Sequence, residues 1–171
     1  MRLIAAFVAS AIAAPLALLN APVAAQDAAE QAALAAALRG QTVTLEKGLA
    51  ASAKAGKPIS GKFEIEDGKL ILSVYTVKGG KFYEVVEDPK TGKVEKTEAI
   101  TDKGDLDHAT AQSASMGKVK GSLSSAVSRA TKANRGFRAV SAYPGMQDGH
   151  PVADITLVQG STFKSVSQKL D

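Results

Sequence analysis

The chain has 171 residues, of which 45% are hydrophobic, 5% aromatic and 22% charged, with a formal net charge of +4 and no cysteine. The missing cysteines exclude a disulfide framework, a cysteine-ligated zinc site and a thiol nucleophile. The apolar and charged fractions are typical of a globular chain rather than a disordered one. Because the lysines and arginines do not form a cluster, the sequence does not support nucleic-acid binding.

Residues 1–25 have the pattern of a secretory signal peptide. Arg2 precedes an apolar run without acidic residues, and small residues end the segment at Ala25. A charged start, an apolar middle and a small-residue cleavage site define such signals. A membrane anchor is the alternative, but a span needs about 20 apolar residues, and Pro15 and Asn20 interrupt this run. We predict cleavage after Ala25, a periplasmic or secreted protein, and no membrane attachment after cleavage.

Two parts of the remaining chain resemble each other. Asp67–Val85 and Asp148–Val166, offset by 81 residues, share turn, glycine and apolar positions. The segments before them, Thr44–Gly56 and Ser122–Asn134, align with an offset of 78 residues, and we expect a longer loop around Pro144 to absorb the difference. A period of roughly 80 residues is too long for a solenoid repeat and fits a duplicated small domain.

The first copy starts with helices and continues with strands. Residues 28–39 are rich in strong helix formers, so a helix is predicted there. The next helix is predicted to begin at Thr44, whose hydroxyl can cap the first turn, and to end at Gly56 in a left-handed cap. Alternating apolar residues and the hairpin signal Asp67-Gly68 then predict three antiparallel strands that end at Glu87.

The second copy has the same order of elements. A helix is predicted at Leu106–Met116, and the next helix is capped by Ser122 and ends at Asn134, again in a left-handed cap. Three strands follow within Arg138–Ser167. We predict an α+β fold of two repeated units, each a helix packed on a three-stranded antiparallel sheet. The predicted units span residues 26–101 and 122–171, with a linker or helix at 102–121.

The strand and turn at Lys81–Val94, KFYEVVEDPKTGKV, resemble the end of a PepSY domain, in which an aromatic strand precedes an Asp-x-x-Thr-Gly-x-Val turn. The resemblance covers Leu45–Val94 well and Leu123–Asp171 more weakly, since the second copy has Ser-Gln-Lys-Leu-Asp in place of the turn. It implies a small α+β domain of exported bacterial proteins. Such domains occur in propeptides of secreted metallopeptidases, where they are associated with inhibition and chaperoning, and in free-standing proteins. The resemblance implies no catalytic residue.

Few residues could carry catalysis or bind a metal. Asp105, Asp107 and His108 could ligate a divalent ion, but acids at a helix start are also explained by the helix dipole. The second histidine, His150, follows a predicted turn, where an exposed side chain is expected. Neither a Gly-x-Ser-x-Gly elbow nor a phosphate-binding glycine motif occurs. Four strand carboxylates are expected on the solvent face of the sheet: Glu64, Glu66, Glu84 and Glu87.

One face of the predicted sheet has no helix to cover it. Ile71, Tyr75 and Val77 alternate with the helix-facing residues of the same strand. The two units could cover this face by packing on each other or by joining into one sheet. Alternatively, the face could bind a partner, or an edge strand could accept an extended peptide. For partner binding, the expected contacts are Tyr75, Phe82 and Tyr83, because aromatic residues favour interface cores.

Together these patterns favour a non-enzymatic periplasmic or secreted protein that binds a protein or an extended peptide, with a peptidase as the partner that the PepSY resemblance implies. The alternative is an envelope protein that binds a small ligand or a metal ion at Asp105, Asp107 and His108. An enzyme is the least supported class, since acid–base chemistry needs clustered groups with tuned pKa values. We expect no cofactor and no nucleic-acid partner.

Overall fold

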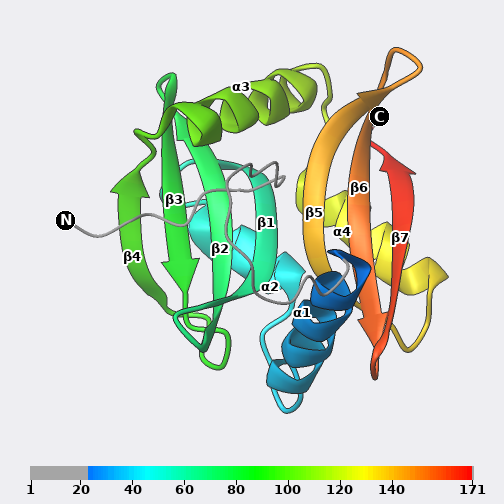
Figure 1. Cartoon of the computed structure of the whole chain (residues 1–171). Coiled ribbons are helices and arrows are strands. Elements are labelled where there is room, and N and C mark those ends of the chain that lie inside the picture. The colour runs from blue at the N-terminus through cyan, green and yellow to red at the C-terminus, as the bar shows by residue number, and fades with distance from the viewer. Residues whose placement is uncertain (1–22, 171) are drawn as a thin grey trace.

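The computed structural model describes residues 23–170, and in it seven antiparallel strands form one sheet with helices on both faces (Figure 1). We call the side of α1 and α3 the front face and the side of α2 and α4 the back face. The α+β class is confirmed. The elements in chain order are α1 (Val23–Ala37), α2 (Leu45–Ser52), β1 (Lys57–Glu66), β2 (Lys69–Lys78), β3 (Lys81–Glu87), β4 (Val94–Ala99), α3 (Lys103–Gly117), α4 (Leu123–Ala133), β5 (Arg138–Gln147), β6 (His150–Gln159) and β7 (Thr162–Lys169).

The predicted signal peptide lies outside the described residues, except that α1 begins at Val23, before the expected cut. Within the part of the chain that the structure describes, no helix is both long and apolar enough to cross a membrane.

The sheet is continuous because β1 pairs with β5. The strand order is β4-β3-β2-β1-β5-β6-β7. At the junction Gly61 lies opposite Ala142 and Lys62 lies opposite Ser141. The two sets of strands thus join into a single sheet, one of the arrangements that the sequence left open. The expectation that no helix covers the face of Tyr75 is wrong, because α3 packs there (Figure 1) and Tyr75 is buried against Asp105.

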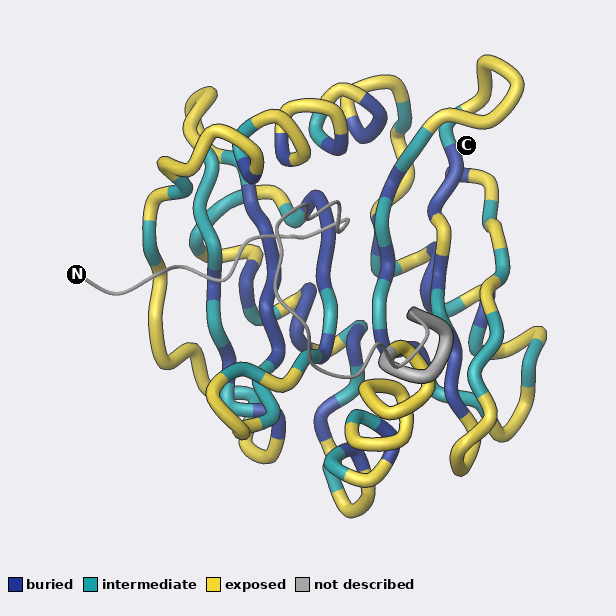
Figure 2. Tube along the Cα trace, viewed as in Figure 1, coloured by how far each residue is buried: buried dark blue, intermediate teal, exposed yellow. Residues whose placement is uncertain are grey.

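The main hydrophobic core lies between the back face and the helices α2 and α4 (Figure 2). The apolar residues of each helix recur every three or four positions, and those of each strand recur at every second position. Both sets therefore face the same layer and pack against each other there. At the junction, a Cβ added to Gly61 would lie 3.2 Å from Leu49 Cδ2, so glycine allows α2 to approach the sheet. The fully buried residues of this layer include Leu45, Leu72, Val74, Leu123, Val127, Ile155 and Leu157.

The predicted N-caps are confirmed, but the left-handed C-caps are wrong. Thr44 accepts from Lys47 N, and Ser122 accepts from Ser125 N. Asn134 has φ −123°, and its side-chain amide donates to a helix carbonyl instead. Gly56 has no left-handed φ either; an added Cβ would lie 2.7 Å from the Val77 carbonyl oxygen, so this glycine is required by close packing.

The hairpin predictions are confirmed by backbone angles. Asp67 and Gly68 have φ values of 49° and 75°, and Asp148 and Gly149 have 50° and 80°. Positive φ at both central residues defines a type I′ turn, whose twist matches that of the flanking strands.

Two details of the predicted topology are wrong. A fourth strand, β4, follows the Asp88 turn at the edge of the sheet; its residues are nearly all exposed, so the alternating apolar pattern that reveals a strand is absent. The extra residues of the second half are not in a loop at Pro144, which lies inside β5. They are matched by a longer helix, since α4 has 11 residues and α2 has 8.

Glu87 is fully buried on the back face, so its expected place on a solvent face is wrong. Ser52 of α2 donates to Glu87 Oε1 at 2.5 Å, while Oε2 has no hydrogen-bond partner among the described residues. Glycine at position 48 leaves room for this carboxyl, because an added Cβ would lie 3.1 Å from Oε2 and 2.2 Å from Leu72 Cδ2. Burial raises the pKa of Glu87 to about 7, and the Ser52 hydrogen bond opposes this only in part.

We expect Glu87→Gln to stabilise the fold at alkaline pH. Between pH 4.5 and about 7 the folded state binds more protons at Glu87 than the unfolded state, so stability falls as pH rises through this window. The full loss is about 3 kcal/mol for a shift of this size, and glutamine avoids it. Urea unfolding at pH 5 and pH 8.5 measures the difference. Equal pH dependence in the variant, the wild type and the exposed control Glu95→Gln would contradict the assignment.

Candidate binding cleft

A cleft of about 600 Å³ lies between α1 and β1. Acidic side chains come from both elements, namely Asp27 and Glu30 of α1 and Glu64 of β1. We call this space the acidic cleft; it is lined by Asp27, Glu30, Gln31, Ala33, Leu34, Phe63, Glu64 and Ile65. The chain as a whole carries a net charge of +4, so the acidity is local.

The floor of the acidic cleft is apolar. Phe63 is buried and Leu34 is half-buried, whereas Ile65 is 40% exposed, which is high for a large aliphatic side chain. An apolar floor with a few convergent polar groups is the usual composition of a binding pocket. The charge and shape of this cleft suit an aliphatic or aromatic side chain next to a cationic group.

The electrostatics of the front face are dominated by partly buried carboxylates. Lys62 forms an ion pair with Glu64 at 2.5 Å. Burial raises the pKa of Glu64 even so, because the loss of solvent outweighs the nearby ammonium. Burial likewise raises the pKa of Glu84, which accepts from Ser73 at 2.5 Å. A cation placed here would reduce the repulsion between these carboxylates.

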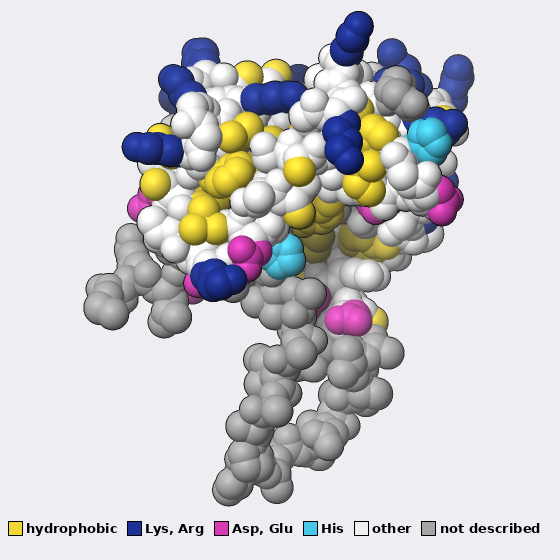
Figure 3. Space-filling view, turned by 90° about the horizontal axis from the view of Figure 1, so that it is seen from above, with side chains coloured by type: hydrophobic (Ala, Val, Ile, Leu, Met, Phe, Trp, Pro, Cys, Tyr) yellow, Lys and Arg dark blue, Asp and Glu magenta, His cyan; other side chains and the backbone are white. Residues whose placement is uncertain are grey.

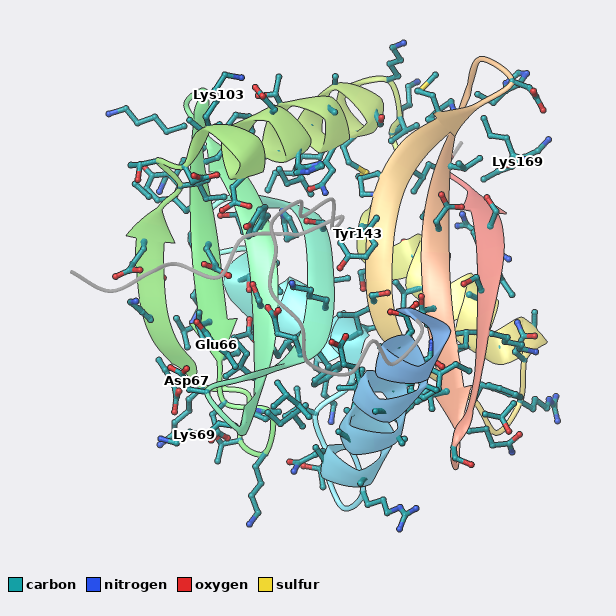
Figure 4. All side chains as sticks on the ribbon, viewed as in Figure 1. Glu66, Asp67, Lys69, Lys103, Tyr143 and Lys169 are labelled. Carbon is teal, nitrogen blue, oxygen red and sulfur yellow. The ribbon has the colours of Figure 1, made fainter. Side chains whose placement is uncertain are left out.

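Tyr143 lies in the middle of the front face between α1 and α3 (Figure 4). Its side chain is half-buried, and burial raises the pKa of its hydroxyl, with a further contribution from the charge of Glu64. The phenol is therefore a neutral polar group above the sheet junction.

Arg138 fixes the base of the front face. Its guanidinium donates to the carbonyl oxygens of Leu38 at 3.3 Å, Gln41 at 3.1 Å and Val43 at 2.7 Å. It also lies 5.4 Å from the ring centre of Phe63, within the range of a cation–π contact. One side chain at the start of β5 thus holds the segment between α1 and α2 and contacts Phe63 in the floor of the acidic cleft.

The aromatic residues predicted to contact a partner do not form one surface. Tyr75 is 1% exposed on the front face, and its hydroxyl hydrogen-bonds to Asp105 of α3. Burial, followed by the charges of Glu84 and Asp105, raises the pKa of Tyr75. Phe82 pairs with Val77 on the same face, but Tyr83 pairs with Thr76 on the back face. These three aromatic residues do not line the acidic cleft.

The possible metal ligands at the start of α3, namely Asp105, Asp107 and His108, do not converge on one site. Asp105 is buried against Tyr75, while Asp107 accepts from Lys103 at 2.7 Å on the surface. His108 and His150 are exposed, and the two imidazoles lie apart in the view from above (Figure 3). Within residues 23–170, no group of three or more histidine and acidic residues could hold a metal ion.

The turn after β3 connects the sheet to the segment that enters α2. Asp88 Oδ1 accepts from Thr91 Oγ1 at 2.8 Å, from Thr91 N at 2.6 Å and from Lys90 N at 3.0 Å. The hydrogen bonds from Thr91 lower the pKa of Asp88. Thr42 donates to the Lys90 carbonyl at 3.1 Å, so the turn holds the chain just before Val43, which Arg138 binds from the other side.

The acidic cleft was missed by sequence reasoning because its residues belong to two separate patterns. Glu64 was interpreted as part of a solvent face, which its alternation with Phe63 and Ile65 allows. On α1, Asp27, Glu30 and Leu34 lie at helical spacing, so they share one face. Only the tertiary arrangement brings the two patterns together.

Comparison with known proteins places this cleft inside a recognised domain. Residues 24–98 match the sequence model of the family PepSY, described as "Peptidase propeptide and YPEB domain". The match extends from α1 into β4 and includes every residue that lines the acidic cleft. Among proteins of curated function, none matches the sequence.

One similar solved structure is a candidate lipoprotein from Clostridium difficile 630. It is 15% identical in sequence, and the alignment covers 67% of this chain and 75% of that chain with a TM-score of 0.37.

We expect Arg138→Ala to destabilise the fold and to release α1. The change removes three hydrogen bonds that the charged guanidinium donates, so the three carbonyl oxygens lose this donor. We expect the free energy of unfolding to fall by about 2–4 kcal/mol. Arg138→Lys should recover only part of this, because an ammonium cannot reproduce the planar fork. Urea unfolding gives the stability, and limited proteolysis near Gln41 reports the release. A loss no greater than that of the exposed control Arg135→Ala would refute the role of Arg138.

Proposed function

We propose, from the match of residues 24–98 to the PepSY family model, that this protein is a non-enzymatic, extracytoplasmic binding protein that regulates a peptidase. The observation that carries the proposal is the position of the acidic cleft within the matched domain. PepSY domains are propeptide and regulatory domains, so binding to a peptidase is the activity that this assignment favours. The signal-like residues 1–25 support a location outside the cytoplasm.

In this proposal the chain consists of two PepSY-like units, at residues 26–101 and 122–171, that share one sheet. The order helix–strand–strand–strand at α2-β1-β2-β3 is repeated at α4-β5-β6-β7. The turn pairs support the same reading, since Asp67-Gly68 and Asp148-Gly149 occupy matching hairpins with matching φ values. Within residues 23–170, no counterpart of the Asp88 turn and of β4 follows β7.

The acidic cleft is the part of the first unit that would receive the partner. Asp27, Glu30 and Glu64 offer carboxylates, and Leu34 and Ile65 offer apolar contact. A segment that carries a lysine or arginine next to an apolar side chain satisfies both. Such a segment can come from a loop of the peptidase or from its incompletely folded chain, which corresponds to inhibition or to chaperoning.

Kinetic measurements on secreted metallopeptidases that have been freed of their own propeptides test the proposal. We expect the purified chain either to inhibit one of them saturably or to accelerate its refolding from denaturant. The double variant Glu30→Lys/Glu64→Lys should weaken the effect at least tenfold, which corresponds to about 1.4 kcal/mol of binding free energy.

The control variant is Glu95→Lys on β4, which makes a similar charge change on an exposed strand far from the acidic cleft. It should leave inhibition and refolding unchanged. Failure of the chain to affect either process across the panel would overturn the proposed function. An effect that survives in the cleft variant would instead reject this cleft as the binding surface.

A further inference from the structure

The two edges of the sheet differ in whether the third strand of each half has a further strand beside it. On one side, the third strand of the first half, β3, is paired along its outer side with β4. On the other side, the third strand of the second half, β7, is the last strand of the sheet (Figure 1). Within residues 23–170, no segment occupies the position beside β7 that β4 occupies beside β3.

The registers of the two halves show which groups of β7 are available. Phe82 lies opposite Val77 in the first half, and Phe163 lies opposite Val158 in the second. The Phe82 carbonyl accepts from Ile100 N at 3.0 Å, so main-chain groups at this position point away from β2. Because main-chain groups alternate in direction along an antiparallel strand, the corresponding outward-facing residues of β7 are Phe163, Ser165 and Ser167.

The side chains around this edge are cationic. Residues 162–169 include Lys164 and Lys169 and no acidic residue. Helix α4, which packs behind β7, carries the exposed cations Arg129 and Lys132 and also no acidic residue. The Arg129 guanidinium donates to the Lys169 carbonyl at 2.5 Å, which places it at the edge itself. Lys169 extends from the same edge in Figure 4.

Two copies of this edge would repel each other. An antiparallel β7–β7 pair would bring the lysines of both chains together without a carboxylate between them. Two acids lie near this edge. Asp154 is opposite Ser167 on the neighbouring strand β6, and Asp148 lines a shallow pocket with Ser167 and Lys169. They are outnumbered by Lys164 and Lys169 of β7 together with Arg129 and Lys132 of α4. The charge pattern therefore selects an acidic occupant rather than a second β7.

We infer that β7 is a docking edge for an extended, acidic segment of another protein, which adds to the sheet as an antiparallel strand in the position that β4 has beside β3. Main-chain hydrogen bonds to Phe163, Ser165 and Ser167 hold the segment. Every second side chain of the segment faces α4, where carboxylates meet Arg129 and Lys132. This surface is separate from the acidic cleft, so the inference does not depend on the proposed function.

The test uses the purified chain and a fluorescein-labelled octapeptide with the sequence Glu-Val-Glu-Thr-Glu-Val-Glu-Thr. Fluorescence anisotropy should show saturable binding that weakens as salt is added. A peptide with lysine in place of every glutamate should bind at least tenfold more weakly. The same loss is expected for a peptide with alternate main-chain nitrogens methylated, because it cannot complete the ladder.

Two variants of the chain place the binding on β7. Ser165→Pro removes an outward-facing N–H and should reduce affinity at least tenfold, with circular dichroism to show that the variant is folded. Lys169→Glu changes only an exposed charge and should reduce affinity at least threefold, whereas Lys96→Glu on β4 should have no effect.

Several results would overturn the inference. These are the absence of saturable binding, equal binding of the lysine or methylated peptide, and an equal effect of Lys96→Glu and Lys169→Glu. Concentration-dependent oligomers that compete with the peptide would also overturn it, because the edge would then belong to a second copy of the chain.

Discussion

The short pairing of β1 with β5 is the interaction on which the rest of the structure depends. It turns two sets of strands into one sheet, which gives α2 and α4 a common surface to cover. Gly61 at this junction permits the close approach of α2. Thr131 of α4 also donates to Glu46 of α2 at 3.3 Å, so the helices contact each other behind the junction. The single core that results explains how a chain without cysteine can hold both halves together.

The same junction organises the front face. Arg138 is the first residue of β5, and its reach to Val43 and Phe63 connects the second half of the chain to the segment that leads into α2. The acidic cleft therefore has walls from the matched domain but a base held by a residue outside it. If the chain binds a peptidase there, the second half acts as a support for the first. Within residues 23–170, the outer edge of β7 has no neighbouring strand, and the docking proposed there would give the second half a surface of its own.

Local chemistry made much of this fold predictable. The Asp67-Gly68 turn, the Thr44 cap and the alternation around Tyr75 each depend on neighbouring residues, and each was found from sequence. The burial of Glu87 could not be predicted, because a carboxylate on a strand is expected to be exposed. Only the position of α2, which covers this residue, shows that it is buried. The same holds for β4, whose exposed residues carry no periodic signal, and for the acidic cleft, whose walls are distant in sequence.

Amide hydrogen exchange at the sheet junction tests the central claim most directly, namely that the two halves form one cooperative structure. We expect the protected amides of Gly61–Lys62 and Ser141–Ala142 to exchange with the same free energy as those of β2 and β6, near the global free energy of unfolding. Exchange at the junction with a much smaller free energy, while β2 and β6 stay protected, would contradict it. The halves would then be independent domains in contact.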